Sequence, residues 1–430
     1  MKKIVKGLLA GAVAAATAVS LFSFSACSFG KDGEDFSLYK TYLELKEAGE
    51  FSGTFSEFVE RYLSPEISTD ESLLSSTINA ALLNVVSIKV SCEYTATRTV
   101  MSSSLGSGVV WEVDRTAGDA TIVTNCHVIY DSFEPTLTKN GSTYTRSSSP
   151  LEYNLYLYGM EYETYAVPFA IVGYSVENDV AVLKVEDSEV IKNSLLTAVT
   201  VGDSDKVAVG DDVFLVGNAC GEGISATRGI VSVESEYVSV YDATGERSDS
   251  HLLSLRSIRT DAAANEGNSG GGFFNRKGEL IGILFAGDSE AQGIGDCLPI
   301  SGVKGIVNSI LYNCNGTTVN TKKALIGITA VRSKTEQIYE GNRVTVVDTV
   351  SVSESSNSKI SKGDVLLSAK VTAPDSTVRA SVDKVTKTWQ ISDMMWFARV
   401  GDTVTLTVLR SGEEKTVSIS VTSLSMKDVG

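Results

Sequence analysis

The hydrophobic period of the chain changes to two at about residue 81, and this change most constrains the fold. Beyond this point polar and apolar residues alternate in short segments, as they do in half-buried β-strands. Glycine and aspartate turns separate these segments, the clearest of which are 87–93, 109–113, 120–124, 180–185, 213–216 and 280–285. Many short strands with turns between them are typical of a β-sandwich or β-barrel. The sequence therefore predicts a mostly β protein.

A second, smaller β-rich domain is predicted for residues 324–424. Period-two alternation returns there at 404–408 and 416–421. A short capped helix is expected in the same domain at 392–398. The first domain, over 81–312, ends in an amphipathic helix at 301–311, where apolar residues recur at helical spacing. The polar segment 313–323 joins the two domains as a linker.

Composition and charge exclude several classes of protein. The chain has 430 residues, of which 43% are hydrophobic, so it can bury a core and is not a disordered chain. Its net charge of −16, with no basic patch, argues against nucleic acid as a partner, because such a surface repels phosphate backbones. The only histidines are His127 and His251, and no Cys-x-x-Cys pair occurs. We therefore expect neither a metal ion nor another cofactor.

The N-terminus has the pattern of a secretory signal. Lysines at positions 2, 3 and 6 precede an uncharged apolar stretch, 7–26. The segment Phe24-Ser25-Ala26-Cys27 resembles the lipobox of bacterial lipoproteins, which predicts a signal peptide over 1–26 and a lipid on Cys27. The alternative is an uncleaved anchor helix, since about 20 apolar residues can span a bilayer. Both alternatives place the remaining chain in the cell envelope, outside the cytoplasmic membrane, or in the periplasm if there is an outer membrane.

A polar spacer, residues 27–80, is predicted between the signal and the β-rich region. Helical periodicity is expected within it at 39–45 and 55–63. We interpret this segment as a connection that holds the folded domains away from the membrane.

Three short motifs carry residues suited to nucleophilic catalysis. The strongest is Gly267-Asn268-Ser269-Gly270-Gly271-Gly272, in which glycines let the backbone turn sharply around one serine. Such a turn can aim two backbone N–H groups at one point, as an oxyanion beside the serine requires. The alternative is a tight glycine-rich turn with a solvated serine.

A catalytic serine needs an imidazole base within hydrogen-bond reach. His127 ends an apolar strand and is the better candidate, because His251 lies in a polar stretch typical of a solvated loop. Asp179 opens the apolar strand 180–185, where a partly desolvated carboxylate needs a partner. An imidazole N–H would satisfy this carboxylate and fix the tautomer that accepts the serine proton. Taken singly, a histidine that ends a strand is more often structural than catalytic, and an aspartate in a turn is common.

Together, and in this order, the motifs resemble those of the HtrA (Deg) family of trypsin-like serine proteases. The resemblance covers residues 81–312 and rests on Gly106-Ser107-Gly108-Val109, Thr124-Asn125-Cys126-His127-Val128, Asp179-Val180-Ala181-Val182-Leu183-Lys184-Val185, Val216-Gly217-Asn218 and Thr260-Asp261-Ala262-Ala263-Ala264-Asn265-Glu266-Gly267-Asn268-Ser269-Gly270-Gly271. It implies a trypsin-like double six-stranded β-barrel with the triad His127, Asp179 and Ser269 between the barrels. It also implies an oxyanion hole formed by the backbone N–H groups of Gly267 and Ser269, and it allows a homo-oligomer.

The second domain resembles a PDZ domain, which follows the protease in this family. Leu325-Ile326-Gly327-Ile328 resembles the loop whose backbone amides bind a peptide carboxylate, so Ile326, Gly327 and Ile328 are expected to bind carboxy-terminal peptides. The peptide would add as a strand beside the helix predicted at 393–398. The stretch 332–342 is longer and more polar than the usual pattern. A PDZ-shaped domain without a ligand is the alternative.

Two residues bear on the substrate side chain that precedes the cut. Ala263 lies six residues before Ser269, where tryptic enzymes carry an acid, and this favours an apolar specificity pocket. Asp296 stands where the family has an aromatic residue near that pocket. An unpartnered Asp296 carboxylate would favour a substrate lysine or arginine, whereas an Asp296 that points away or is paired would leave the apolar preference.

The sequence therefore predicts a lipid-anchored serine endopeptidase that cleaves unfolded or damaged polypeptides through an acyl-enzyme intermediate. The rival from another class is a non-catalytic adaptor or chaperone that carries a PDZ domain on a protease-like scaffold. The complete set of His127, Asp179 and Ser269 favours the enzyme, because a scaffold does not require all three residues.

Overall fold

The computed structural model describes residues 70–161, 163–244, 247–287, 293–313, 321–340 and 343–429, together with 45–46, 48–49 and 51–52. The signal, Cys27 and most of the spacer lie outside these residues, as do the predicted helix at 55–63 and residues 39–44 of the helix predicted at 39–45. Among the described helices, none has both the length and the apolar character needed to cross a membrane.

The chain forms two compact units, Met1–Leu73 and Leu74–Gly430. In the first unit, the described residues form a turn in which the Phe51 N–H donates to the Leu45 carbonyl oxygen over 3.1 Å. Helix α4 (Asp70–Ala81) leads into the strands of the second unit. The second unit contains both predicted domains.

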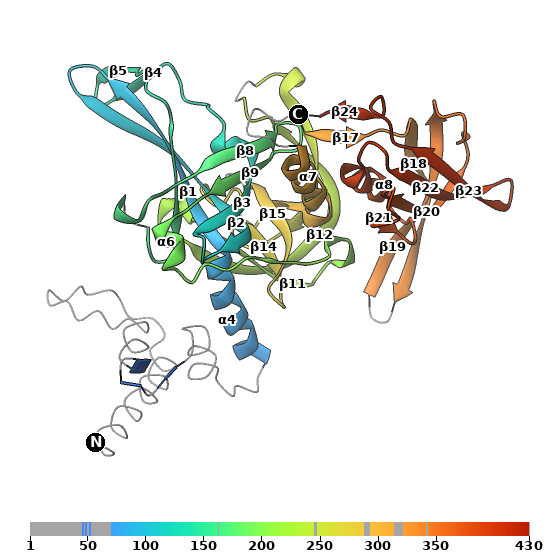
Figure 1. Ribbon diagram of the computed structural model, residues 1–430, viewed down its shortest axis with the longest axis horizontal. Coiled ribbons are helices and arrows are strands. Elements are labelled where there is room, and N and C mark those ends of the chain that lie inside the picture. Colours follow the sequence, from blue (N-terminus) through green and yellow to red (C-terminus); the bar gives the residue numbers. More distant parts are fainter. Residues whose placement is uncertain are drawn as a thin grey trace. The chain divides into compact units, whose positions relative to one another are not determined.

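Six antiparallel strands form the first barrel of the first domain (Figure 1). Their order in the sheet is β6 (Glu152–Leu157), β1 (Val85–Thr95), β2 (Thr99–Asp114), β3 (Asp119–Thr124), β9 (Val180–Val185) and β8 (Ala170–Ser175). The apolar residues of the alternating segments point to one face and form a closed core that includes Ile88, Ile122 and Leu183. The short strand β7 (Val167–Pro168) pairs with β6 at its side.

A hairpin lies within residues 131–150, a stretch rich in serine and threonine. Strands β4 (Thr136–Lys139) and β5 (Ser142–Arg146) pair across Asn140 and Gly141. Both turn residues have positive φ, 52° and 75°, as a two-residue hairpin turn that matches the strand twist requires. The hairpin extends the β1–β2 ribbon (Figure 1), and Tyr94 and Tyr144 pack together between them.

The second barrel is a closed ring of six antiparallel strands. In ring order these are β11 (Asp212–Gly217), β12 (Ser225–Tyr241), β13 (Leu252–Thr260), β16 (Gly295–Pro299), β15 (Glu279–Gly287) and β14 (Gly272–Asn275). Strand β10 (Thr200–Val201) pairs with β15 outside the ring. The stacked rings of Phe214 and Phe274 lie in a core that the two barrels share with helix α7 (Ile300–Asn313).

The second domain is a five-strand path with one side strand and a short helix. The strands run in the order β18 (Ile328–Glu340), β19 (Arg343–Ser355), β20 (Val365–Thr372), β22 (Thr403–Arg410) and β23 (Glu413–Ser420), and β21 (Val378–Val382) pairs with β20. Strands β17 (Lys322–Ala324) and β24 (Met426–Asp428) form a separate pair. The helix predicted at 392–398 begins three residues earlier, as α8 (Trp389–Met394), and continues as the 3₁₀ helix η6 (Met395–Phe397). The predicted mostly β fold, with two barrels followed by a smaller β-rich domain, is confirmed.

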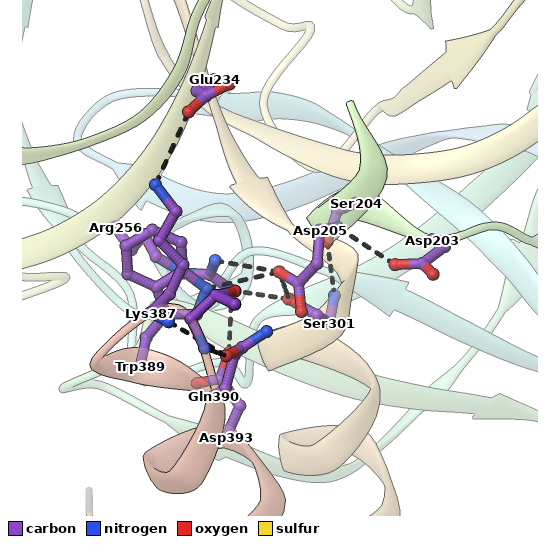
Figure 2. A network of polar contacts seen from close by, with 11 residues as sticks. Asp203, Ser204, Asp205, Glu234, Arg256, Ser301, Lys387, Trp389, Gln390 and Asp393 are labelled. Atoms are coloured by element: carbon purple, nitrogen blue, oxygen red, sulfur yellow. Dashed lines mark hydrogen bonds and ion pairs between the residues drawn. The ribbon is translucent and has the colours of Figure 1, made fainter. Parts of the chain in front are cut away.

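A polar network joins the second barrel to helix α8 (Figure 2). The Arg256 guanidinium, on β13, lies 2.8 Å from the Asp393 carboxylate of α8 and 3.4 Å from that of Asp205. It also donates to Ser301 Oγ over 2.6 Å and lies over the ring of Trp389. Because its side chain is only 10% exposed, these contacts replace most of its hydration and fix α8 against the barrel.

Candidate active site

The imidazole of His127 and the carboxylate of Asp179 form a direct pair. His127 lies on the short helix α5 (Cys126–Ile129), which follows β3, and Asp179 lies just before the neighbouring strand β9. The distance from His127 Nδ1 to Asp179 Oδ2 is 2.8 Å, and the His127 backbone N–H donates to Asp179 Oδ1 over 2.9 Å. The Asp179 side chain is 8% exposed and that of His127 is 37% exposed. The carboxylate is therefore the buried member, and the imidazole faces the side from which a substrate can arrive.

The backbone of Asp179 adopts a conformation that its neighbours hold in place. Its φ of 51° is in the left-handed region, which costs a non-glycine residue about 1–2 kcal/mol. The buried side chain of Asn125 donates from Nδ2 to the Asp179 carbonyl oxygen over 2.9 Å. Asn125 belongs to the His127 motif, but sequence analysis assigned it no role. Its position directly before α5 lets it hold the aspartate while His127 contacts the carboxylate.

The pKa of His127 reflects two opposing causes. Burial lowers the pKa, but the charge of Asp179 and its hydrogen bond raise it by more, so the pKa lies above the usual 6.5. The protonated ring is therefore stabilised, as a general base requires once it has accepted a proton. Burial raises the pKa of the Cys126 and Cys297 thiols, so both stay protonated.

Ser269 lies in a turn whose backbone N–H groups alternate between bonded and free. The N–H groups of Asn268, Gly270 and Gly271 donate to carbonyl oxygens at 3.1, 2.8 and 2.8 Å. Within the described part of the chain, those of Gly267 and Ser269 have no hydrogen-bond acceptor. Two free donors two residues apart, beside a half-buried serine, match the requirement for oxyanion stabilisation.

The orientation of the peptide between Glu266 and Gly267 is fixed from the opposite side. The Cys220 N–H donates to the Glu266 carbonyl oxygen over 2.7 Å, so the Gly267 N–H points away from Cys220. Gly267 has a φ of 87°, and a Cβ at this position would clash with the Asn218 carbonyl oxygen. Glycine is therefore required here both by the backbone conformation and by the available space.

Ser107 connects the serine turn to the first barrel. Its N–H donates to the Ser269 carbonyl oxygen over 2.8 Å, and its Oγ donates to the Gly267 carbonyl oxygen over 2.7 Å. The Ser107 carbonyl oxygen accepts from Thr124 Oγ1 over 2.6 Å, three residues before His127. The role of Ser107 does not follow from its motif alone, but its place between two glycines of strand β2 is a signal for it. This chain of contacts brings the Ser269 turn to the His127 side of the barrel interface.

The Ser269 hydroxyl makes no hydrogen bond to any described residue, the His127 ring included. The structure therefore joins His127 to Asp179 directly, whereas Ser107 and Thr124 connect the Ser269 turn to the strand that precedes His127. Catalytic hydrogen bonds are often long in ligand-free enzymes and shorten when substrate binds.

Asp296 is paired in this structure. It lies on β16 directly opposite Arg259 of β13, and its side chain is 7% exposed. Its Oδ1 accepts from Ser257 Oγ over 2.8 Å and lies 3.5 Å from Arg259 Nε. The unpartnered carboxylate on which a lysine or arginine preference would depend is therefore not present. Ala263 is exposed and places no charge near the serine turn.

The loop before β18 leaves two backbone donors free. Gly327 has a φ of 72°, and its carbonyl oxygen accepts from the Ser356 N–H over 2.8 Å. The N–H groups of Ile326 and Gly327 donate to no acceptor among the described residues. The Ile326 side chain is buried in the core of the second domain, which anchors the loop at the start of β18.

Comparisons with known proteins match both domains of the chain. Residues 106–283 match the family model of the trypsin-like peptidase domain, and residues 324–421 match that of the PDZ domain. The chain is 26% identical over 328 residues to the serine protease Do-like HtrA of Lactococcus lactis subsp. lactis (strain IL1403), covering 74% of this chain and 71% of that protein. It is 27% identical over 333 residues to the periplasmic serine endoprotease DegP of Escherichia coli (strain K12), covering 76% and 58%. A solved structure, HtrA-type protease AlgW with decapeptide, is 20% identical and has a TM-score of 0.46. The match covers 81% of this chain and 98% of that one.

Proposed function

Because the chain belongs to the HtrA family of trypsin-like serine proteases with a PDZ domain, we propose that Ser269, His127 and Asp179 are its catalytic triad. The protein is a serine endopeptidase of protein quality control, and its substrates are polypeptides. The observation that carries the assignment of the triad is the 2.8 Å contact between His127 Nδ1 and Asp179, which lies beside a serine turn with two free N–H groups. The rival function, a non-catalytic adaptor, does not require this arrangement.

The proposed reaction proceeds in two halves. Ser269 Oγ attacks the carbonyl carbon of the scissile peptide and gives its proton to His127 Nε2, while Asp179 holds the other ring nitrogen. The N–H groups of Gly267 and Ser269 stabilise the negative oxygen of the tetrahedral intermediate. His127 then protonates the leaving nitrogen, and the C–N bond breaks to leave an ester on Ser269. A water molecule, activated by the neutral His127, hydrolyses this ester.

We expect kcat/KM to rise with pH through an inflection above 6.5, because only neutral His127 can accept the serine proton and Asp179 raises its pKa. In Asp179→Asn the inflection should move to lower pH. The rate should fall about 10⁴-fold, because the His127 ring is no longer held in the tautomer that accepts the serine proton. A fluorogenic peptide assayed from about pH 5 to about pH 9 measures both effects. A wild-type inflection below that of Asp179→Asn would contradict the role of Asp179.

The same raised pKa of His127 adds folding stability that is fully present below about pH 6.5 and lost as the pH rises through the folded-state value.

The pairing of Asp296 supports an apolar preference at the substrate residue before the cut. Its Oδ1 accepts a hydrogen bond from Ser257 and lies 3.5 Å from the Arg259 guanidinium, and Ala263 adds no charge. We therefore propose small apolar side chains at this position.

Localisation in the cell envelope is proposed from the signal and from the periplasmic relatives. The lipobox-like sequence ending in Cys27 supports a lipid anchor. We expect wild-type protein from membranes to carry a diacylglyceryl group on Cys27, and Cys27→Ala to accumulate as an unprocessed precursor without the acyl mass. Intact-mass spectrometry of both proteins tests this, with Cys220→Ala as a matched control that keeps normal processing. Normal processing of Cys27→Ala would favour a plain secreted or helix-anchored protein.

The loop of Ile326, Gly327 and Ile328 is proposed to bind the free carboxylate of a peptide. Its two unpaired N–H groups support this, because a carboxylate is the acceptor that such donors favour. We expect an amidated peptide to bind roughly 10–100-fold more weakly than the same peptide with a free carboxylate, since a hydrogen bond to a charged group contributes about 1.5–3 kcal/mol. Fluorescence polarisation with Ser269→Ala protein, which cannot cleave the probe, measures the ratio. Equal binding of the two peptides would contradict the assignment.

A further inference from the structure

The second domain contains a two-stranded ribbon that is longer than a peptide groove requires. Strands β18 and β19 have 13 residues each and pair along their whole length, from Ile328 opposite Ser355 to Glu340 opposite Arg343. At about 3.3 Å per residue, β18 is roughly 40 Å long. The polar stretch 332–342, which departs from the usual PDZ pattern, forms the far half of this ribbon.

The outer edge of β18 is unpaired. In the sheet order, β18 is the terminal strand and has β19 as its only partner. Alternate residues of such a strand point their N–H and C=O groups away from the sheet. Among the described residues, no backbone hydrogen bond from an element other than β19 reaches 331–339. These residues therefore offer a continuous row of donors and acceptors.

This edge is continuous with the proposed carboxylate loop, because β18 begins at Ile328, directly after Gly327. Near this start, Ala330 of β18 and Trp389 of α8 line a cavity of about 400 Å³, together with Arg256 and Tyr237 of the second barrel. A chain whose carboxyl end is held in the loop enters this space first. Its upstream residues must then run antiparallel to β18, towards the tip of the ribbon.

The ribbon favours a flexible peptide over a second folded copy of the chain. Two register shifts, between Thr329 and Ala330 and between Arg332 and Lys334, interrupt the pairing of β18 with β19. Bulges and edge charges, such as those of Lys334 and Glu336, obstruct pairing between two rigid sheets. An extended, unfolded segment can follow a twisted edge, because its own backbone is free to adapt.

We propose that the β18 edge from 331 to 339 binds the unfolded segment that precedes the carboxyl end of a bound polypeptide. The proposal rests on the carboxylate loop and specifies its ligand further. The preferred ligand is an unstructured C-terminal tail of more than about ten residues, and a short tail on a folded protein lacks the length to use the edge. Recognition is through the backbone, so it tolerates many sequences, as a quality-control protease requires.

The test compares two free-carboxyl peptides that share their last five residues and have total lengths of about five and about thirteen. The added residues are neutral, polar and unstructured, and the protein is the full chain with Ser269→Ala. We expect the long peptide to bind about tenfold or more tightly, because several backbone hydrogen bonds are added and only part of their gain is lost to ordering the peptide. Equal affinity for the two lengths would overturn this proposal and leave the carboxylate loop intact. If neither length binds, both proposals fail.

Backbone pairing is separated from other effects by N-methylation of the long peptide. Two versions of the long peptide carry methyl groups on alternate upstream nitrogens, and their methylated positions differ by one residue. In one register the blocked N–H groups face β18 and the length-dependent gain is lost; in the other they face away and most of it remains. Loss or retention of the gain in both registers equally would overturn strand addition.

A shortened ribbon tests the protein side. Thr335 and Asp348 are direct cross-strand partners, so replacing 336–347 by Asn-Gly closes a two-residue hairpin between them. The replacement keeps the contact from Thr335 Oγ1 to the buried Asp348 carboxylate. We expect unchanged affinity for the short peptide and loss of most of the gain for the long one. A full gain in the shortened protein would contradict the proposal, and the N-methylated peptides test it on the unaltered ribbon if this variant does not fold.

Discussion

Ser269→Ala and His127→Ala are each expected to lower the rate of casein digestion on the order of 10³-fold or more, because the members of a catalytic triad act as a unit. Ser269→Ala removes the attacking oxygen, and His127→Ala removes the base together with the partner of Asp179. Loss of the Ser269 hydroxyl should leave the unfolding temperature unchanged, since this hydroxyl makes no hydrogen bond within the described structure.

The second histidine provides a matched control. His251 also pairs with a carboxylate, since its Nδ1 lies 2.9 Å from Asp242 Oδ2. Its side chain is 27% exposed, so it is less solvated than the sequence predicted. It lies in the short 3₁₀ turn Asp249–His251 that joins β12 to β13. We expect His251→Ala to retain near wild-type activity. Activity that survives in His127→Ala but disappears in His251→Ala would reverse the assignment of the base.

Gly270→Ala is expected to lower the free energy of unfolding by roughly 2–5 kcal/mol and to abolish most of the activity. A Cβ on Gly270 would clash with the Ser107 carbonyl oxygen and Thr124 Oγ1, and its φ of +83° is unfavourable for alanine. The strain costs about 1–2 kcal/mol and the overpacking about 1–3 kcal/mol. The Ser107 N–H, on β2 of the first barrel, donates to the Ser269 carbonyl oxygen. Relief of the clash with Ser107 therefore moves the Ser269 turn away from the first barrel. Urea unfolding and a peptide-cleavage assay measure the two effects.

Gly412→Ala separates the clash from the strain. Gly412 has the same φ of +83°, but nothing lies within 4 Å of its Cβ position. We expect this variant to lose only about 1–2 kcal/mol and to keep full activity. An equal loss of stability in the two variants would show that the contact between the Gly270 turn and β2 is not tight.

The residues proposed for catalysis stand out in the sequence because each lies in a local motif with a distinctive environment. His127 follows a strand, Asp179 precedes one, and Ser269 is surrounded by glycines. The residues that hold these motifs together could not be predicted in the same way. Ser107 and Asn125 act through contacts with residues far along the chain, and such contacts depend on how the barrels pack.

The orientation of Asp296 shows a second limit of sequence reasoning. Neighbouring residues of a strand point to opposite faces, so a shift of one position decides whether a carboxylate faces the pocket or the next strand. The partners Ser257 and Arg259 lie on β13, and only the register of β13 with β16 places them beside Asp296. The hairpin across Asn140 and Gly141, by contrast, has a local signal, because this dipeptide between alternating residues favours a two-residue turn.

The most direct test of the catalytic centre is covalent labelling with an organophosphorus fluoridate. Attack by Ser269 Oγ forms an O–P bond, the P–F bond breaks, fluoride leaves, and the hydroxyl proton passes to His127. Peptide mapping by mass spectrometry should find the phosphorus adduct on Ser269 alone in the wild-type protein and almost none in His127→Ala. Labelling of another residue, or no labelling of a preparation that digests casein, would contradict the account.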